Sequence, residues 1–139
     1  MKNLSPYLMF NGNCEEAMYF YQDCLGGKIE YMRRYTNTPL DVPEDKQKKI
    51  MHAEFSFWGG NLMFSDLMDE ANFTTPATAS NIHLNLGFED KNKMQETFDK
   101  LKQGGKVTTE LEEQFWGDIF GMVQDKYGIN WMFICPAEK

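Results

Sequence analysis

The chain has few of the residues that usually carry metal or nucleophilic chemistry. It contains only two histidines, His52 and His83, and three cysteines, Cys14, Cys24 and Cys135. An odd number of cysteines without Cys-x-x-Cys spacing argues against a disulfide framework and against a cysteine-rich zinc site. We therefore expect reduced thiols that mostly fill the core, in a protein of the cytoplasm.

Basic residues and long apolar runs are also scarce. Lysine and arginine number 14 against 21 acidic residues, a net charge of −7, which argues against nucleic-acid binding. No apolar run is long enough to span a bilayer, and residues 1–6 lack the apolar stretch of a signal peptide. We therefore expect no membrane association, and a small molecule or another protein remains as the partner.

What the chain does have is a globular composition rich in aromatic and thioether side chains. Its 139 residues suit a single domain with a real core, and 42% of them are hydrophobic. Aromatic residues make up 14%, and ten methionines are present. Aromatic and methionine side chains in this number fill a core, or they line a pocket for a planar or apolar ligand.

Internal repetition indicates two halves of one design within that domain. Residues 26–28 (Gly-Gly-Lys) recur as residues 104–106, and residues 61–64 (Asn-Leu-Met-Phe) recur as Asn-Trp-Met-Phe at 130–133. Two copies of long period favour a duplicated unit closing around a shared cavity over a solenoid. Module one covers about 1–66, a connector about 67–79, and module two about 80–139.

The local pattern predicts the same order of elements in both modules. Helices are expected to begin after the capping residues Asn13 and Asp90 and to stop at the Gly-Gly pairs 26–27 and 104–105. Alternation and turn residues predict strands at 5–10, 28–35, 50–58, 62–65, 81–88, 106–111, 118–124 and 130–134. The predicted fold class is therefore α+β, built from two modules of strand, helix and three strands.

Alternation also divides each strand into two faces. In strand 50–58, Ala53 and Phe55 fall on an apolar face that suits packing against a helix, and His52, Glu54 and Trp58 fall on the other. The mixed faces carry apolar side chains among polar ones, which suits a cavity lining or a dimer interface. The apolar side chains expected there are Tyr7, Met9, Trp58, Met63 and Met132.

The side chains able to do chemistry are few, and each has two interpretations. His52 and Glu54 form a general base with its orienting carboxylate, or a polar pair at a sheet edge. Asp66 caps a turn or points into the cavity, and His83 is a metal ligand or an ordinary sheet histidine. Trp116 stacks on a planar ligand, or it closes the core or a dimer contact.

Several stretches together resemble the PhnB-like branch of the vicinal oxygen chelate superfamily, which includes glyoxalases, bleomycin-resistance proteins and extradiol dioxygenases. The resemblance implies paired βαβββ modules that form a half-open β-barrel cup, usually as a homodimer. The stretches that carry it are residues 6–12, 16–21, 26–27, 49–53, 59–66, 116–121 and 125–131.

The resemblance also implies where a divalent ion would bind. Enzymes of this superfamily use His or Gln on the first strand of each module and Glu on the fourth. In this chain those positions hold Ser5, Met63, His83 and Met132, so His83 is the one usual ligand. Because hard cations prefer oxygen and imidazole to thioethers, we expect no cofactor and disfavour a divalent metal, although such a set is able to take copper(I).

Two functions follow from these observations. The first is a metal-independent dimeric protein that binds a small aromatic or amphipathic molecule through Tyr7, Trp58, Met63, Asp66, His83, Trp116 and Met132. The second is a glyoxalase-like or dioxygenase-like enzyme that uses a divalent ion or a His52–Glu54 base on a small oxygenated substrate. A methyltransferase label on some relatives finds no support in the sequence, because its glycine pairs follow helices and form no nucleotide-binding loop.

Overall fold

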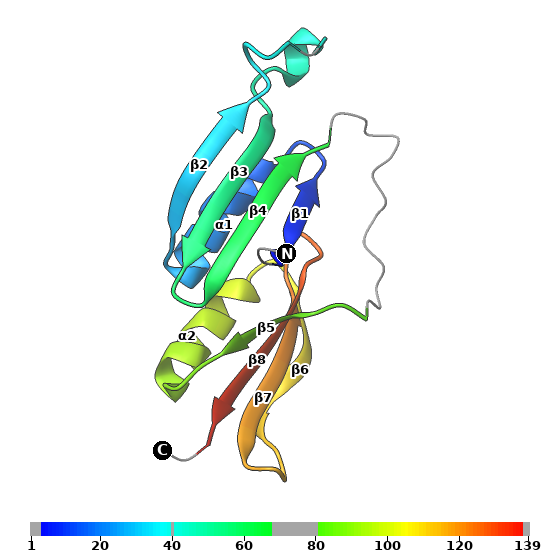
Figure 1. Ribbon diagram of the computed structural model, residues 1–139. Coiled ribbons are helices and arrows are strands. Elements are labelled where there is room, and N and C mark those ends of the chain that lie inside the picture. Colours follow the sequence, from blue (N-terminus) through cyan, green and yellow to red (C-terminus); the bar gives the residue numbers. More distant parts are fainter. Residues whose placement is uncertain (1–3, 40, 68–80, 138–139) are drawn as a thin grey trace. The chain divides into compact units, whose positions relative to one another are not determined.

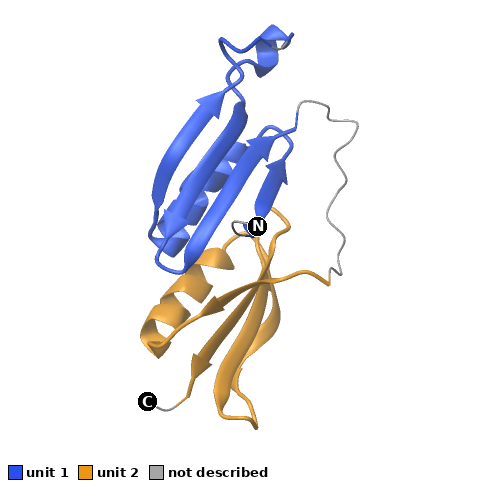
Figure 2. Ribbon diagram, in the orientation of Figure 1, with its two compact units in different colours: residues 1–74 blue, residues 75–139 orange. Residues whose placement is uncertain are grey.

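The computed structural model describes residues 4–39, 41–67 and 81–137 and divides the chain into two compact units. Unit 1 covers residues 1–74 and unit 2 covers residues 75–139 (Figure 2). The division falls within the predicted connector at about 67–79, which lies outside the described residues except for Leu67.

Both units have the predicted order of strand, helix and three strands (Figure 1). Unit 1 contains β1 (Tyr7–Phe10), α1 (Cys14–Leu25), β2 (Lys28–Arg34), a single 3₁₀ turn (Glu44–Lys46), β3 (Ile50–Phe57) and β4 (Gly60–Asp66). Unit 2 contains β5 (Leu84–Gly87), α2 (Lys91–Leu101), β6 (Lys106–Glu113), β7 (Asp118–Gln124) and β8 (Asn130–Pro136).

Each unit forms one mixed sheet of four strands. The strand order is β1-β4-β3-β2 in unit 1 and β5-β8-β7-β6 in unit 2. In both sheets the first strand runs parallel to the last, and the other neighbours are antiparallel. The repeated topology confirms the predicted α+β class with two βαβββ modules, and within the described residues neither sheet closes on itself.

The two Gly-Gly pairs end their helices in the same way. Gly26 takes the left-handed conformation (φ 64°), and its N–H donates to the carbonyl of Gln22 at 2.9 Å. Gly27 lies so close to β3 that an added Cβ would collide with the carbonyl oxygen of Ser56. In unit 2, Gly104 has φ 75° and Gly105 lies against the carbonyl of Gln124. The first glycine therefore turns the chain, and the second allows close packing.

The helix starts match the prediction in one unit and contradict it in the other. The Asp90 carboxylate accepts from the backbone N–H of Asn92 at 2.8 Å and caps α2 as predicted. The predicted cap by Asn13 is wrong, because its side chain makes no capping hydrogen bond. Asp66, from the end of β4, accepts instead from the N–H of Cys14 at 2.9 Å.

Each unit has its own aromatic core between helix and sheet. In unit 1, Tyr21 of α1 stacks on Phe64 of β4 with ring centroids 5.9 Å apart. In unit 2, Phe98 of α2 meets Phe133 of β8 edge-on at 5.2 Å. All three cysteines are buried and none forms a disulfide. Burial raises the pKa of the Cys14 thiol well above its usual range, and the Asp66 and Glu15 carboxylates act in the same direction.

The strand predicted at 81–88 is shorter than expected. β5 begins at Leu84, which pairs with Trp131, so His83 precedes the strand and Ile82 is 71% exposed. Its partner β8 begins at Asn130, the position opposite His83, so residues before His83 have no part of β8 beside them. Among the described residues, no helix is long and apolar enough to cross a membrane.

Candidate functional site

The face of the first sheet opposite α1 is the candidate site, and we call it the open face. Helix α1 packs on β2, β3 and β4 and covers the other side of the sheet (Figure 1). In register, Met63 of β4 has Tyr7 of β1 on one side and Glu54 of β3 on the other. Paired residues project to the same side of a sheet. The open face is therefore made by Tyr7, Met9, Tyr31, His52, Glu54 and Met63.

His52 is held between a phenol and a carboxylate on this face. Its Nδ1 lies 2.9 Å from the hydroxyl oxygen of Tyr7, and its Nε2 lies 3.5 Å from Oε1 of Glu54. Its ring also lies near those of Tyr7 and Tyr31, with centroids at 5.7 and 6.0 Å. The structure thus brings the predicted His52–Glu54 pair together and adds Tyr7, which sequence reasoning did not connect to it.

The neighbours of His52 define where its proton lies when the ring is neutral. Glu54 only accepts, so the tautomer that carries the proton on Nε2 satisfies this contact. Nδ1 is then the acceptor for the hydroxyl of Tyr7. The three groups form an ordered chain in which Tyr7 donates to Nδ1 of His52, and Nε2 of His52 faces the Glu54 carboxylate at 3.5 Å.

Tyr7 is the member of this chain that meets both the protein interior and the solvent. The residue is 44% exposed, yet burial around its hydroxyl raises the pKa of the phenol, against a hydrogen bond with Ser65 that lowers it. The phenol therefore keeps its proton at neutral pH and acts as the donor toward His52.

A hollow of about 210 Å³ lies beside Met63 and includes Ser5 and Met63, the two positions of unit 1 to which the family resemblance assigned metal ligands. Two carboxylates also reach it, from Glu30 and Glu54. Sequence reasoning missed Glu30 because a bulge between Ile29 and Tyr31 breaks the alternation of β2. The complete lining is Ser5, Glu30, Glu54, Phe55, Asn61, Leu62 and Met63.

The side chains of this hollow do not fit a hard divalent ion. Glu30 already accepts from the hydroxyl of Ser56 at 2.7 Å, and Glu54 faces His52. Within residues 4–39, 41–67 and 81–137, no three histidine, cysteine, aspartate or glutamate side chains are placed to share an ion. Met63 offers a thioether where a hard cation needs a carboxylate.

Asp66 lies away from the open face. It is 2% exposed, and its two carboxylate oxygens accept from the N–H groups of Cys14 and Ile50, each at 2.9 Å. Its own carbonyl accepts from the hydroxyl of Tyr35 at 3.0 Å. These bonds join β4 to the start of α1, to β3 and to the end of β2, so the structure gives Asp66 a structural role at a position predicted to bind ligand.

The remaining predicted site residues are divided between the units. Trp58 lies in the turn between β3 and β4 of unit 1, is 56% exposed and meets Phe57 edge-on at 6.1 Å. In unit 2, Met132 pairs with Asn85 and Met122, and His83 is partly buried just before β5. Trp116 lies in the turn between β6 and β7, 51% exposed and edge-on to Phe115 at 5.0 Å.

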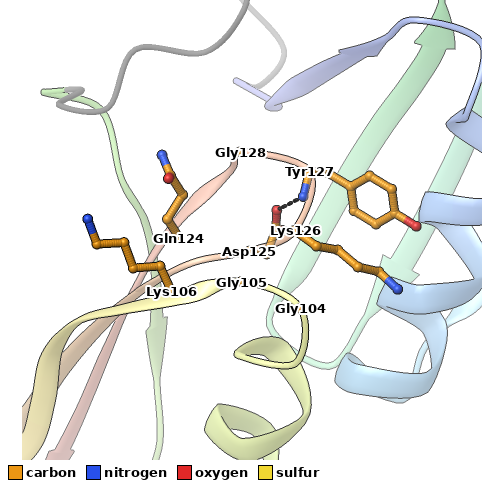
Figure 3. Close-up of a pocket in the computed structure, with 8 residues that line it drawn as sticks. All are labelled: Gly104, Gly105, Lys106, Gln124, Asp125, Lys126, Tyr127 and Gly128. Carbon is orange, nitrogen blue, oxygen red and sulfur yellow. Dashed lines mark hydrogen bonds between the residues drawn. The ribbon is translucent and has the colours of Figure 1, made fainter.

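A larger hollow of about 420 Å³ lies in unit 2 beside the turn from β7 to β8. Figure 3 shows Lys106 and Gln124 extending to one side of this turn and Lys126 and Tyr127 to the other. The buried Asp125 carboxylate is fully used by the N–H groups of Tyr127, Ile129 and the Trp131 indole. No set of side chains converges there, so this hollow is a turn surface.

Comparison with known proteins agrees with this geometry. A family model described as 3-demethylubiquinone-9 3-methyltransferase matches residues 2–134. Protein YjdN of Escherichia coli is 32% identical over an alignment that covers 93% of this chain and 92% of YjdN. The PhnB protein of Bacillus cereus is 27% identical, with a TM-score of 0.79 over 96% of this chain and 99% of its own.

A more distant neighbour defines the class of fold. A glyoxalase/bleomycin-resistance/dioxygenase domain from Frankia is 15% identical and has a TM-score of 0.66 over 99% of this chain and 94% of its own. The fold is thus that of the glyoxalase and bleomycin-resistance proteins. The chain belongs to the PhnB-like family that the matching family model describes, as the sequence predicted.

The methyltransferase in the family description would need a methyl donor, and most such donors are nucleotide-like. A nucleotide site uses glycines between a strand and the following helix. Here the glycine pairs follow helices, and strand backbone occupies the space beside Gly27 and Gly105. The two glycine pairs therefore do not form such a site.

Proposed function

We propose that the protein is a metal-independent, homodimeric binding protein for a small aromatic or amphipathic molecule. The observation that carries this proposal is the composition of the open face. Tyr7, Met9 and Tyr31 are each 43–44% exposed there, around the polar pair of His52 and Glu54. Exposed aromatic and thioether surface beside a few fixed polar groups is typical of a ligand-binding surface.

The thioether of Met63 supports the metal-independent part of the proposal. It lies in register between Tyr7 and Glu54, where it adds polarisable apolar surface to the open face. A planar ligand on this face would contact the Tyr31 ring and the Met63 thioether, and its polar group would reach the hydroxyl of Tyr7.

A panel of planar one- to three-ring aromatic molecules tests the proposal by thermal shift. We expect at least one molecule to raise the melting temperature equally with and without a chelator. The gain should shrink in Tyr31→Ser and persist in Tyr19→Ser, because Tyr19 is 51% exposed but lies on α1. A panel without stabilisation, or stabilisation that needs a divalent ion, would contradict the proposal.

A further inference from the structure

The chain of contacts through His52 ends at Tyr7, a residue that is 44% exposed. Both ring nitrogens of His52 are engaged, Nδ1 by Tyr7 and Nε2 by Glu54, and the ring has tyrosine rings near it. A molecule on the open face therefore reaches the relay at Tyr7, and not through a ring nitrogen of His52.

We propose that Tyr7, His52 and Glu54 form a proton relay in which Tyr7 is the residue that exchanges a proton with the bound molecule. His52 receives the proton of Tyr7, and Glu54 positions and stabilises the resulting imidazolium. This assignment moves the reacting atom from the imidazole, where a His52–Glu54 base would place it, to the phenol oxygen.

The proton balance of the step is simple. The Tyr7 oxygen takes a proton from an O–H or N–H group of the ligand while it passes its own proton to Nδ1 of His52. The ligand becomes an anion that is hydrogen-bonded by the re-formed Tyr7 hydroxyl, and the imidazolium faces the Glu54 carboxylate. No metal ion, oxidant or second reactant is required.

The surroundings of Tyr7 show why a relay is needed. Burial raises the pKa of the phenol, so Tyr7 is a poor base or nucleophile if it must first ionise alone. The hydrogen bond of 2.9 Å to Nδ1 offers a path in which the phenol never becomes a free phenolate. A nucleophile or base activated by an imidazole that is itself oriented by a carboxylate is the general logic of catalytic triads.

The geometry also limits the ligand. Because the Tyr7 hydroxyl donates to His52 and also has a hydrogen bond with Ser65, its oxygen can only accept from the ligand, which must carry an O–H or N–H donor. Met9, two residues along β1, and Tyr31, whose ring lies 6.0 Å from that of His52, add apolar surface to this face and favour an apolar or planar body. The ligand class rests on the proposed binding function, whereas the relay itself depends only on the contacts of His52.

Labelling with benzenesulfonyl fluoride tests the relay without any ligand. In this reaction the phenol oxygen bonds to sulfur, fluoride leaves, and the phenol proton goes to Nδ1 of His52. Tyr19 is the internal control, since it is 51% exposed against 44% for Tyr7. Burial raises the pKa of the Tyr7 phenol, so labelling without a relay should be slow. With the relay, we expect Tyr7 to react at least about tenfold faster than Tyr19.

Three variants separate a relay from a structural hydrogen bond. In His52→Gln the amide oxygen still accepts from Tyr7 but takes no proton, so the labelling rate should fall to that of Tyr19. Glu54→Gln should reduce the rate several-fold, and Ser56→Ala, on the same face of β3, should leave it unchanged. Melting curves check that each variant is folded. If His52→Gln does not fold, Glu54→Gln alone tests the relay.

Two results would overturn the relay. One is a Tyr7 rate no higher than that of Tyr19 in the unaltered protein, and the other is a high rate that survives both His52→Gln and Glu54→Gln. If the aromatic panel shows no stabilisation while Tyr7 is selectively labelled, the binding proposal fails and the relay stands. If a molecule binds and Tyr7 is not selectively labelled, the relay fails and the binding proposal stands.

Discussion

The Asp66 carboxylate shows how one buried residue ties four elements of unit 1 together. Each of its oxygens accepts one backbone N–H, from Cys14 and from Ile50, and its carbonyl accepts the Tyr35 hydroxyl. An asparagine side chain has one acceptor oxygen and one –NH₂ group, so it can accept only one of the two N–H groups. Its –NH₂ group would face the other N–H, and two donors cannot bond.

Asp66→Asn should therefore destabilise the protein by about 2–3 kcal/mol, because one buried N–H group loses its partner and the charged acceptor is replaced by a neutral one. Urea unfolding measures the change. Asp41→Asn is the matched control, since Asp41 is exposed in the loop before the 3₁₀ turn, and it should have almost no effect. Equal stability of the two variants would argue against the structural role of Asp66.

A second contact between residues carries a pH dependence. Arg34 of β2 makes two parallel hydrogen bonds to Glu15 of α1, at 3.0 and 2.8 Å. The hydrogen bond from Arg34 lowers the pKa of the Glu15 carboxyl. A lowered folded-state pKa means that the stabilisation is complete above the ordinary carboxyl pKa and is lost as the pH falls through the lowered value.

A double-mutant cycle with Glu15→Gln and Arg34→Met should give a coupling free energy of about 0.5–1 kcal/mol at pH 7. The value is modest because both side chains are more than a third exposed, at 38% and 40%. Repeating the cycle at decreasing pH should show the coupling disappearing below the ordinary carboxyl pKa. A coupling that persists in strong acid would be inconsistent with an ion pair.

At the scale of elements, the Gly-Gly pairs connect each helix to its sheet. The pair in unit 1 has a positive φ at Gly26 with open space around it, and no space at all at Gly27. Backbone conformation alone would make Gly26 the sensitive position. The close approach of β3 makes Gly27 the sensitive one instead, because the carbonyl of Ser56 belongs to a paired strand and is not free to move.

Gly27→Ala should cost about 3 kcal/mol through overpacking, and Gly26→Ala about 1 kcal/mol through the left-handed conformation. Comparing the free energies of unfolding of the two variants checks the ranking. Should Gly26→Ala be the more destabilising, the approach of helix and strand would be looser than the structure shows.

The elements also show what strand alternation predicts and where it fails. His52, Glu54 and Met63 were assigned to one face from their positions in two strands, and they lie together on the open face. Glu30 was missed because a bulge in β2 changes the direction of the side chains. Tyr7 was assigned to the same kind of face, but its contact with His52 follows from the strand order β1-β4-β3, which alternation does not specify.

At the scale of the whole molecule, the repeat in the sequence becomes two units of identical topology. Unit 2 exposes a pair of aromatic side chains at the turn between β6 and β7, where Phe115 is 98% and Trp116 is 51% exposed. Large apolar side chains exposed next to each other are characteristic of surfaces that contact a partner.

The proposed homodimer should give a light-scattering mass of twice the 16.2 kDa chain. If the aromatic turn contributes to the contact, Phe115→Ser combined with Trp116→Ser should lower the average mass toward that of one chain at micromolar concentration. Tyr19→Ser, which removes an exposed aromatic side chain from α1, is the control. A monomer mass for the unaltered protein would contradict the dimer.

The sequence by itself determined the elements, the module repeat, the family and the apolar and mixed faces of the strands. These depend on periodicity, on turn and capping residues and on repeated motifs, all of which are local along the chain. Only the tertiary structure decided that Asp66 caps α1 in place of Asn13, that Glu30 joins the hollow beside Met63, and that Tyr7 donates to His52. Those contacts join residues distant in sequence, and strand order, bulges and register bring them together.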